Sequence, residues 1–463
     1  MILLPMVFAL TPSWPAAIPS VRALDNCDGI RSALVKLGDL NGDGVCDFAV
    51  AHRPRPFLLG QRPSAEAPLL QQLPLIWVLS GKDGSVLATI QGPGFDPQAY
   101  ELRGARAGEG AKMYQGGTFG STLVAAGDVD GDGKLDLAIG EGRVASPKPC
   151  VILASASDGR VIETFSAPEG SRGFGSSLAG GHDVVGDDQP DLAIADGSGV
   201  WIVDGASLKP LELIVPGDRG VERLPASGWS IPEALPKVNE TLGARPNKVP
   251  EVHFLADMGG DGVAEILIAR GALDGNSPGV GEGHAYVLFS DPERSNLKLD
   301  TEAWCAAGGV DLDGDKRADL ITTTVNHAMQ AWSSVSGKML WEINWDGGYM
   351  HAQGTSLSWA EDRDRDGVRD LWVGSNETFL DADTGSSFLI SAKTGEGQRV
   401  PKGDRVGLLL QGGGQDVTTL GDLDGDGLHE LAVYFPVAQA VRVLKGSDRS
   451  VMWSRQVDAL EVR

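Results

Sequence analysis

The stretch Asp128-Val-Asp-Gly-Asp-Gly-Lys-Leu-Asp136 carries carboxylates at its first, third, fifth and ninth positions. Glycine at the fourth and sixth positions accepts positive φ and lets the chain wind tightly. The first three carboxylates then turn toward one centre, where the carbonyl of the seventh residue and the ninth carboxylate complete the shell. A shell of about six or seven hard oxygen ligands suits Ca²⁺, so the stretch predicts a calcium-binding loop.

Four other stretches repeat this pattern with an oxygen-bearing side chain at the same positions. Mg²⁺ fits less well because it prefers shorter, near-ideal contacts and keeps its waters. Soft metals would require Cys or His, which the ligand positions lack. We therefore predict about five Ca²⁺ sites. Counting the carbonyl of the seventh residue, their ligands are Asp39, Asn41, Asp43, Val45 and Asp47; Asp128, Asp130, Asp132, Lys134 and Asp136; Asp311, Asp313, Asp315, Arg317 and Asp319; Asp362, Asp364, Asp366, Val368 and Asp370; and Asp422, Asp424, Asp426, Leu428 and Glu430.

Two further copies of the pattern have lost one ligand each. Val185 stands at the third position of the copy that begins at Asp183, and Gly259 stands there in the copy that begins at Asp257. We expect weak or empty metal sites in these two loops, with the shape of the loop kept. Their remaining acidic residues are Asp183, Asp187 and Asp191, and Asp257, Asp261 and Glu265.

The flanks of the seven copies also repeat. An apolar residue stands five positions before the first acid of each copy, and a short, mainly apolar run follows the ninth position. Brief apolar runs bounded by Gly and Asp are typical of buried strands, so each loop should join two strands of a hairpin. The apolar residues are Leu34, Leu123, Leu178, Val252, Ala306, Leu357 and Val417.

A third and a fourth strand follow most hairpins, as at 76–80 and 86–90, with a glycine-containing turn between them. One four-stranded antiparallel meander per repeat is one propeller blade. The sequence therefore predicts an all-β, seven-bladed β-propeller with calcium in the loops between the first and second strands, the A–B loops. The repeats are too long for an open β-solenoid, the runner-up fold.

The domain organisation expected is a leader or possible signal segment at 1–25 and a single propeller at 26–463. Met1 to Leu10 is apolar, but no Lys or Arg precedes it, as a secretory signal would require. The sequence contains no run of 18 apolar residues, so no transmembrane helix is predicted. The blades are expected at about 26–100, 101–166, 167–225, 226–298, 299–344, 345–400 and 401–463.

The net charge of −24 argues against nucleic acid as a partner, because phosphate binding needs clustered Lys and Arg. A strongly acidic surface is consistent with a secreted, periplasmic or cell-surface protein. The four cysteines show no metal-binding spacing, and both disulfides and buried thiols remain open for them.

The repeats resemble FG-GAP and VCBS-type repeats, as in the propeller of integrin α-subunits. The Phe-Gly pair stands at Phe119-Gly120 and Phe174-Gly175, and the Gly-Asp-x-Asp-Gly-Asp-Gly core at Gly127 to Gly133 and Gly421 to Gly427. The resemblance implies a seven-bladed propeller with structural calcium in the A–B loops, used for adhesion or ligand binding. Phe-Gly is absent from the other five blades. The family's Gly-Ala-Pro after the second strand is missing, with Gly140-Glu-Gly142 and Gly374-Ser-Asn376 in its place, so the identity of the ligand does not transfer.

Long insertions should mark the binding face. In a meander, the A–B and C–D turns share one face and the B–C and D–A connections share the other, where function concentrates on long loops. We expect a protein or glycan ligand there, opposite the calcium loops. The insertions are Ala51 to Pro74, Gln91 to Thr118, Pro216 to Pro250, Arg270 to Gly283 and Gly395 to Gln415, and the candidate contact residues are Tyr100, Arg103, Arg106, Tyr114, Trp229, His284, Tyr349 and His351.

No catalytic constellation stands out, and the protein is not expected to be an enzyme. The paired carboxylates are already assigned as calcium ligands in the loops. Gly275-Asn-Ser-Pro-Gly279 matches the motif of a nucleophile elbow, but Pro278 opposes the helix that such an elbow needs. A calcium-dependent carbohydrate-active lyase or hydrolase on a propeller scaffold is the alternative function.

Overall fold

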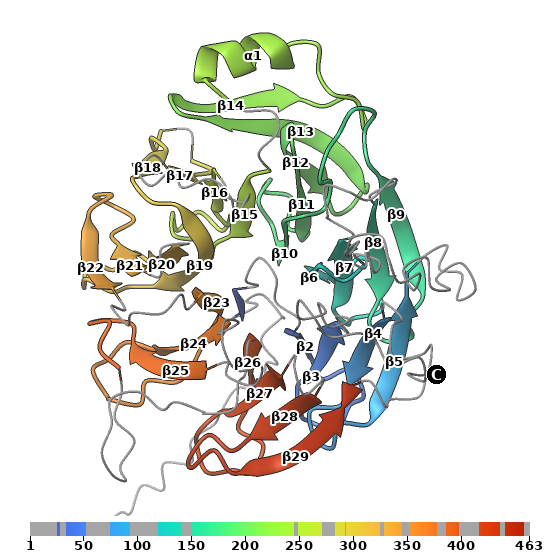
Figure 1. The fold of residues 1–463 in the computed structure, drawn as a ribbon, viewed down its shortest axis with the longest axis vertical. Coiled ribbons are helices and arrows are strands. Elements are labelled where there is room, and N and C mark those ends of the chain that lie inside the picture. Colours follow the sequence, from blue (N-terminus) through green and yellow to red (C-terminus); the bar gives the residue numbers. More distant parts are fainter. Residues whose placement is uncertain are drawn as a thin grey trace, which may run out of the picture.

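The computed structural model describes residues 26–27, 34–51, 75–92, 119–140, 150–244, 249–270, 283–291, 293–324, 328–344, 352–376, 386–397, 416–435 and 440–457. Their strands form seven sheets, which stand side by side as the blades of a ring (Figure 1). Each A–B hairpin is antiparallel. The predicted seven-bladed, all-β propeller is therefore confirmed.

The blades follow the order of the chain, and in most of them four strands run in sequence from the centre of the ring outward. Blade one contains β2 (Leu34–Gly38), β3 (Asp47–Ala51), β4 (Leu75–Leu79) and β5 (Val86–Gln91); blade two contains β6 (Thr122–Gly127), β7 (Asp136–Gly140), β8 (Cys150–Ser155) and β9 (Val161–Ser166); blade three contains β10 (Leu178–His182), β11 (Asp191–Asp196), β12 (Gly199–Asp204), β13 (Lys209–Gly217) and β14 (Gly220–Pro225); blade four contains β15 (Glu251–Phe254), β16 (Ile266–Ala269), β17 (Ala285–Leu288) and β18 (Leu297–Leu299). Blade five contains β19 (Ala303–Val310), β20 (Asp319–Thr324), β21 (Ala328–Trp332) and β22 (Met339–Asn344); blade six contains β1 (Asn26–Cys27), β23 (Ala352–Trp359), β24 (Asp370–Asn376) and β25 (Ser386–Ser391); blade seven contains β26 (Asp416–Gly421), β27 (Glu430–Phe435), β28 (Ala440–Leu444) and β29 (Val451–Gln456).

The second strand of a blade is the most deeply buried because a neighbouring blade covers each face of its sheet. Every residue of β3, β7 and β16 is buried. This explains why the sequence after each ninth position reads as a continuous apolar run instead of an alternating one. The apolar residues five positions before each loop are all buried as well. The outer strands β9 and β29 are mostly exposed.

Blade three differs from the four-stranded plan, because its chain turns back into a fifth strand. The nine-residue β13 pairs with β14, and α1 (Leu235–Leu242) follows, with Pro236 near its start and Gly243 in the left-handed conformation at its end. Trp229, between β14 and α1, packs against Phe165, Phe174 and Trp201. Trp229, a candidate contact residue, is partly buried, and its ring anchors this insertion to blades two and three.

Segments from the beginning of the chain contribute to two blades. Residues 26–27, at the start of the range predicted for the first blade, pair with β23 at the inner edge of blade six. Blade one itself begins at β2 and packs against blade seven, because Tyr434 and Val441 share one apolar cluster with Val50 and Ile76. The ring therefore closes between blades seven and one through a common core. Residues 1–25 lie outside the described residues.

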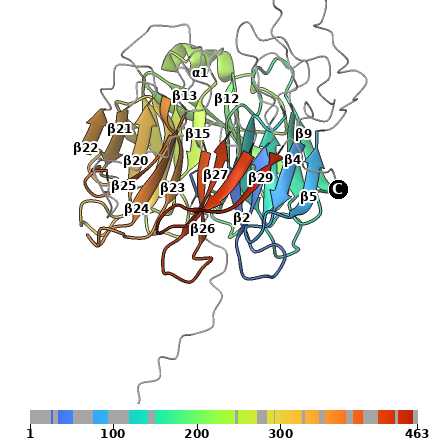
Figure 2. The same ribbon diagram turned by 60° about the horizontal axis from the view of Figure 1, so that its bottom comes forward.

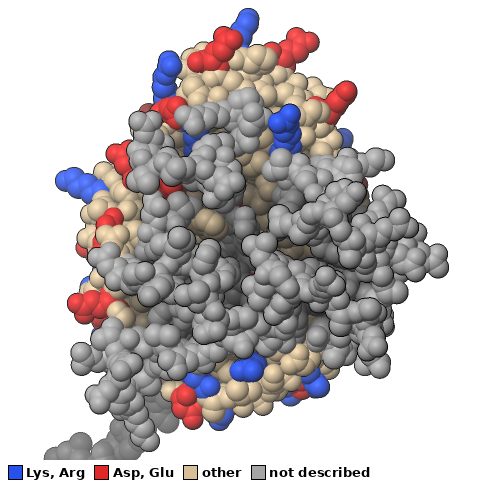
Figure 3. All heavy atoms as spheres, in the orientation of Figure 1, with Lys and Arg blue, Asp and Glu red and all other residues tan. Residues whose placement is uncertain are grey.

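The two faces of the ring differ. Figure 2 shows α1 at one face and the loops that follow β2 and β26 at the other. Most of the long insertions, and with them Tyr100, Arg103, Arg106, Tyr114, Tyr349 and His351, lie outside the described residues. His284 is described, and its Nδ1 lies 3.3 Å from Asp300. On the face shown in Figure 3, described Lys, Arg, Asp and Glu side chains lie around the rim, with both signs interspersed. Within the described part of the chain, no helix is long and apolar enough to cross a membrane.

Candidate metal centre

The seven A–B loops share one backbone winding. In each, the N–H of the sixth residue donates to Oδ2 of the first Asp at 2.7–2.9 Å. The sixth residue is left-handed even where it is Asp188 or Lys316, and Arg365 is left-handed at the fourth position. Side chains rarely adopt this conformation, which costs roughly 1–2 kcal/mol for a residue with a Cβ. The winding is therefore imposed by the carboxylate hydrogen bonds, with glycine easing it.

The ninth acid has a structural role that sequence reasoning missed. Its side chain is buried in every loop, and one of its oxygens accepts the N–H of the second residue, as from Leu40 to Asp47 at 2.8 Å. In blades one, three, five and seven, the other oxygen accepts an N–H from the C–D turn, as from Gly81 to Asp47 at 3.1 Å. The carboxylate thus ties the hairpin to the turn beside it.

Five of the described loops bring three carboxylate oxygens within 4.8 Å of one another. Four of these five loops are among those predicted to have a complete set of calcium ligands. The fifth is the blade-four loop, which was expected to be weak, while the blade-one loop, with Asn41 at its third position, is not in the group. The five sets are Asp128, Asp130 and Asp136; Asp257, Asp261 and Glu265; Asp311, Asp313 and Asp315; Asp362, Asp364 and Asp370; and Asp422, Asp424 and Glu430.

One structural feature of the blade-two loop suits it to bind a divalent cation. Asp136 is fully buried, and its Oδ1 has no hydrogen-bond partner among the described residues. Burial raises the pKa of Asp136 to about 6; the N–H groups of Val129 and Asp130 oppose the rise, and the charges of Asp130 and Asp132 add to it. A buried, unpaired carboxylate oxygen among like charges is costly unless a cation compensates it.

The same electrostatic conflict recurs in the two degenerate loops. Burial, with Asp183 and Asp187 nearby, raises the pKa of Asp191 to about 6. Burial, with Asp257 and Asp261 nearby, raises the pKa of Glu265 to about 7. A positive charge would therefore still stabilise the carboxylates of these two loops, although each loop has lost a ligand.

Basic side chains of the protein itself supply positive charge to several of the A–B loops. The loop motif does not predict this feature. From the C–D turns, Arg160 contacts Asp130 at 2.7 Å and Lys445 contacts Asp424 at 2.9 Å. In blade four, Arg317 of the next loop donates to the carbonyl oxygen of Gly259, and Arg294 donates to that of Met258 at 3.4 Å. A bound cation would share these loops with arginine and lysine.

The chain is similar to a known repeat family and to a curated protein. The FG-GAP repeat family matches residues 119–161, which include the blade-two loop. Integrin alpha pat-2 of Caenorhabditis briggsae is 28% identical over 212 residues, which is 43% of this chain and 16% of the relative. The chain thus spans less than a fifth of that relative's length.

The chain also matches solved structures with which it shares little sequence. BBS1N in complex with ARL6DN, soaked with lead, matches with a TM-score of 0.43 and 10% identity over 90% of this chain and 95% of that one. The C-terminal WD40 domain of Sif2 matches with a TM-score of 0.43 and 9% identity over 89% and 95%. BamB from Moraxella catarrhalis has a TM-score of 0.39 and 8% identity over 87% and 82%. Scores of this size say nothing about the site.

Proposed function

We propose that this chain, an integrin α-like FG-GAP propeller, is a calcium-stabilised binding module that works outside the cytoplasm. The observation that carries the proposal is the blade-two segment, because the FG-GAP match and the buried, unpartnered Asp136 oxygen fall in the same loop. The match to an integrin α-subunit supports a binding role over a catalytic one.

Calcium is assigned a structural role in this proposal. In blade two it would be held by Asp128, Asp130, Asp132, Asp136 and the Lys134 carbonyl, and by the equivalent residues elsewhere. When bound, it supplies the positive charge that lets these carboxylates stay ionised side by side. The chain's own residues hold the loop winding and connect strand B to the C–D turn, so the metal stiffens one face of the ring.

The ligand is assigned to the opposite face. The A–B loops are short and bonded within themselves, as the hydrogen bonds from Gly42 and Gly44 to Asp39 illustrate, so they offer little variable surface. The long insertions connect strands at the other face, where a rigid scaffold can present them. A protein or glycan is the proposed ligand class, and an adhesion role follows from the integrin likeness.

A binding screen with loop replacement tests this function. Purified protein in calcium buffer is screened against glycans and extracellular proteins, and a hit is remeasured with residues 52–74 and 93–118 each replaced by a short Gly-Asn turn. We expect these replacements to reduce affinity at least tenfold, and A–B loop variant Asp43→Asn to leave it unchanged in saturating calcium. Unchanged binding by both replacements, with melting temperature preserved, would contradict the assignment of the face.

A further inference from the structure

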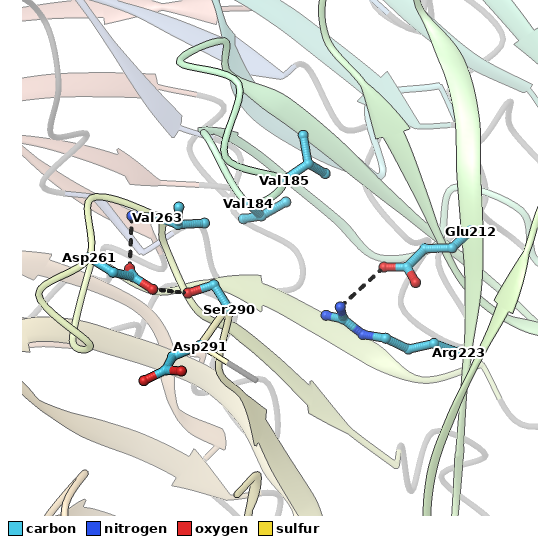
Figure 4. Close-up of a pocket in the computed structure, with 8 residues that line it drawn as sticks. All are labelled: Val184, Val185, Glu212, Arg223, Asp261, Val263, Ser290 and Asp291. Atoms are coloured by element: carbon cyan, nitrogen blue, oxygen red, sulfur yellow. Dashed lines mark hydrogen bonds and ion pairs between the residues drawn. The ribbon is translucent and has the colours of Figure 1, made fainter. Parts of the chain in front are cut away.

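An open cavity of about 500 Å³ lies between blades three and four (Figure 4). It is formed by the A–B loops of both blades, by the outer strands β13 and β14 of blade three, and by the C–D turn of blade four. Its lining residues are Val184, Val185, Glu212, Arg223, Asp261, Val263, Ser290 and Asp291.

The two loops that line this cavity are the two that lack a third-position ligand. Val185 replaces that ligand in blade three and is 40% exposed. In blade four the loop is held against its neighbour, because Ala264 N donates to Asp183 O at 2.8 Å. Val184, Val185 and Val263 give the cavity an apolar side, and Val185 stands where a complete metal loop would present a carboxylate.

Charge on the remaining walls is predominantly negative. Glu212, Asp261 and Asp291 contribute carboxylates, and Arg223 is the cation among the lining residues, 3.7 Å from Glu212. Arg294, nearby in sequence, is not among the lining residues; its charge acts on Asp261 and Asp291, and its Nη2 donates to the carbonyl oxygen of Ser334 at 2.8 Å. The lining residues themselves carry three acids and one base, which makes the cavity attractive to a cation.

The carboxylate of Asp261 is already oriented. Its Oδ2 accepts a hydrogen bond from Ser290 Oγ at 2.6 Å, and its Oδ1 accepts one from Val263 N at 3.1 Å. Figure 4 shows this group on the side of the cavity across from Glu212 and Arg223, with Asp291 nearby. A ligand that met several acids here would need donors pointing in several directions and an apolar stem.

We propose that this cavity docks an arginine side chain of a protein partner. The methylene stem of arginine packs on valines, as amphipathic side chains do on apolar surfaces, and its planar guanidinium offers five N–H donors for separate carboxylates. The site lies on the face of the A–B loops, so it is distinct from the ligand face of the proposed function and does not depend on it.

Short peptides test the proposal directly. Acetyl-Gly-Arg-Gly-amide is titrated against the full chain in saturating calcium, beside the same peptide with citrulline, which keeps the shape and loses the charge, and with lysine. Dissociation constants come from saturation-transfer NMR. We expect arginine to bind at least tenfold more tightly than citrulline and more tightly than lysine. No arginine binding, equal citrulline binding, or tighter lysine binding would each overturn the proposal.

Matched variants locate the binding. Asp291→Asn should weaken arginine binding about tenfold, equivalent to about 1.4 kcal/mol, because it removes a charge and keeps the turn's hydrogen-bond acceptor. Val185→Ser should weaken it as well. The controls are Asp448→Asn in a blade-seven turn and Val335→Ser, whose valine is 57% exposed in a blade-five turn. Equal weakening by controls and cavity variants, or none by either cavity variant, would place the peptide elsewhere and overturn the assignment.

Discussion

Trp453 in the last strand donates its indole N–H to the carbonyl oxygen of Gly81 at 2.9 Å, although 372 residues separate them. The Trp453 ring also stacks on Phe48, with centroids 6.1 Å apart. The same contact exists between neighbouring blades five and six, where Trp341 donates to Ala392 O at 3.0 Å. The ring is therefore closed by the kind of contact that joins consecutive blades.

Replacing Trp453 by Phe should destabilise the ring by about 1–2 kcal/mol, because it removes a hydrogen bond and leaves the Gly81 carbonyl with one partner fewer. Trp341→Phe removes the equivalent hydrogen bond between the consecutive blades five and six and serves as the matched variant. The urea midpoint of each variant measures the effect. A loss for Trp341→Phe with none for Trp453→Phe would show that the contact between blades seven and one does not hold the ring closed.

Removing calcium should lower the melting temperature. A site held at 100 times its dissociation constant adds about 2.7 kcal/mol, and several sites act together. Differential scanning calorimetry with calcium and with excess chelator measures the shift. Asp136→Asn should reduce the shift, because the buried charge that the metal would neutralise is gone, whereas Asp158→Asn, in an exposed turn of the same blade, should keep it. An identical melting temperature in chelator would contradict the structural role of the metal.

Gly259→Asp should restore a metal site in blade four. A Cβ at this position would lie 2.9 Å from Glu265 Oε1 and 3.6 Å from Asp261 Oδ1, so a new carboxylate would enter the existing acidic group once the Glu265 side chain shifts slightly. Equilibrium dialysis with radioactive calcium should then count more bound ions per chain than in the unaltered protein. In chelator the variant should be less stable, because it adds a like charge. Gly228→Asp, in an open loop of blade three, is the control and should leave the count unchanged.

Acidification below pH 6.5 should cost stability through His253. Burial lowers the pKa of this histidine to about 4, against a weaker opposing hydrogen bond to the backbone of Trp304. The unfolded chain takes up the proton first, so this contribution to stability is intact above about pH 6.5 and is lost as the pH falls toward 4. The loss approaches about 3 kcal/mol over that window.

The variant His253→Gln isolates this effect, because other titrating groups, including Asp136 with its raised pKa, remain in both proteins. Urea midpoints between pH 7 and pH 4.5 should fall more steeply for the unaltered protein than for His253→Gln. His284→Gln, at a partly exposed position beside Asp300, should retain the steep fall. Parallel curves for His253→Gln and the unaltered protein would contradict the prediction.

The blade count and the shape of the loops follow from local sequence patterns. Each loop is held by hydrogen bonds between residues two to seven positions apart, such as those from Gly131 and Gly133 to Asp128 and from Val129 to Asp136. Interactions of such short range leave a repeating pattern in the sequence. The apolar runs after the ninth position could also be recognised in the sequence, because a strand that is covered on both faces carries a continuous apolar run.

How distant parts of the chain combine became visible in the folded ring. It placed β1 on blade six, added β14 and α1 to blade three, and closed the ring through Trp453 and Gly81. It also set Val185 and Asp261 on two sides of one cavity and brought Arg317 to the neighbouring loop. These contacts join residues far apart in the chain, and their partners are chosen by packing between blades, so no local pattern reports them.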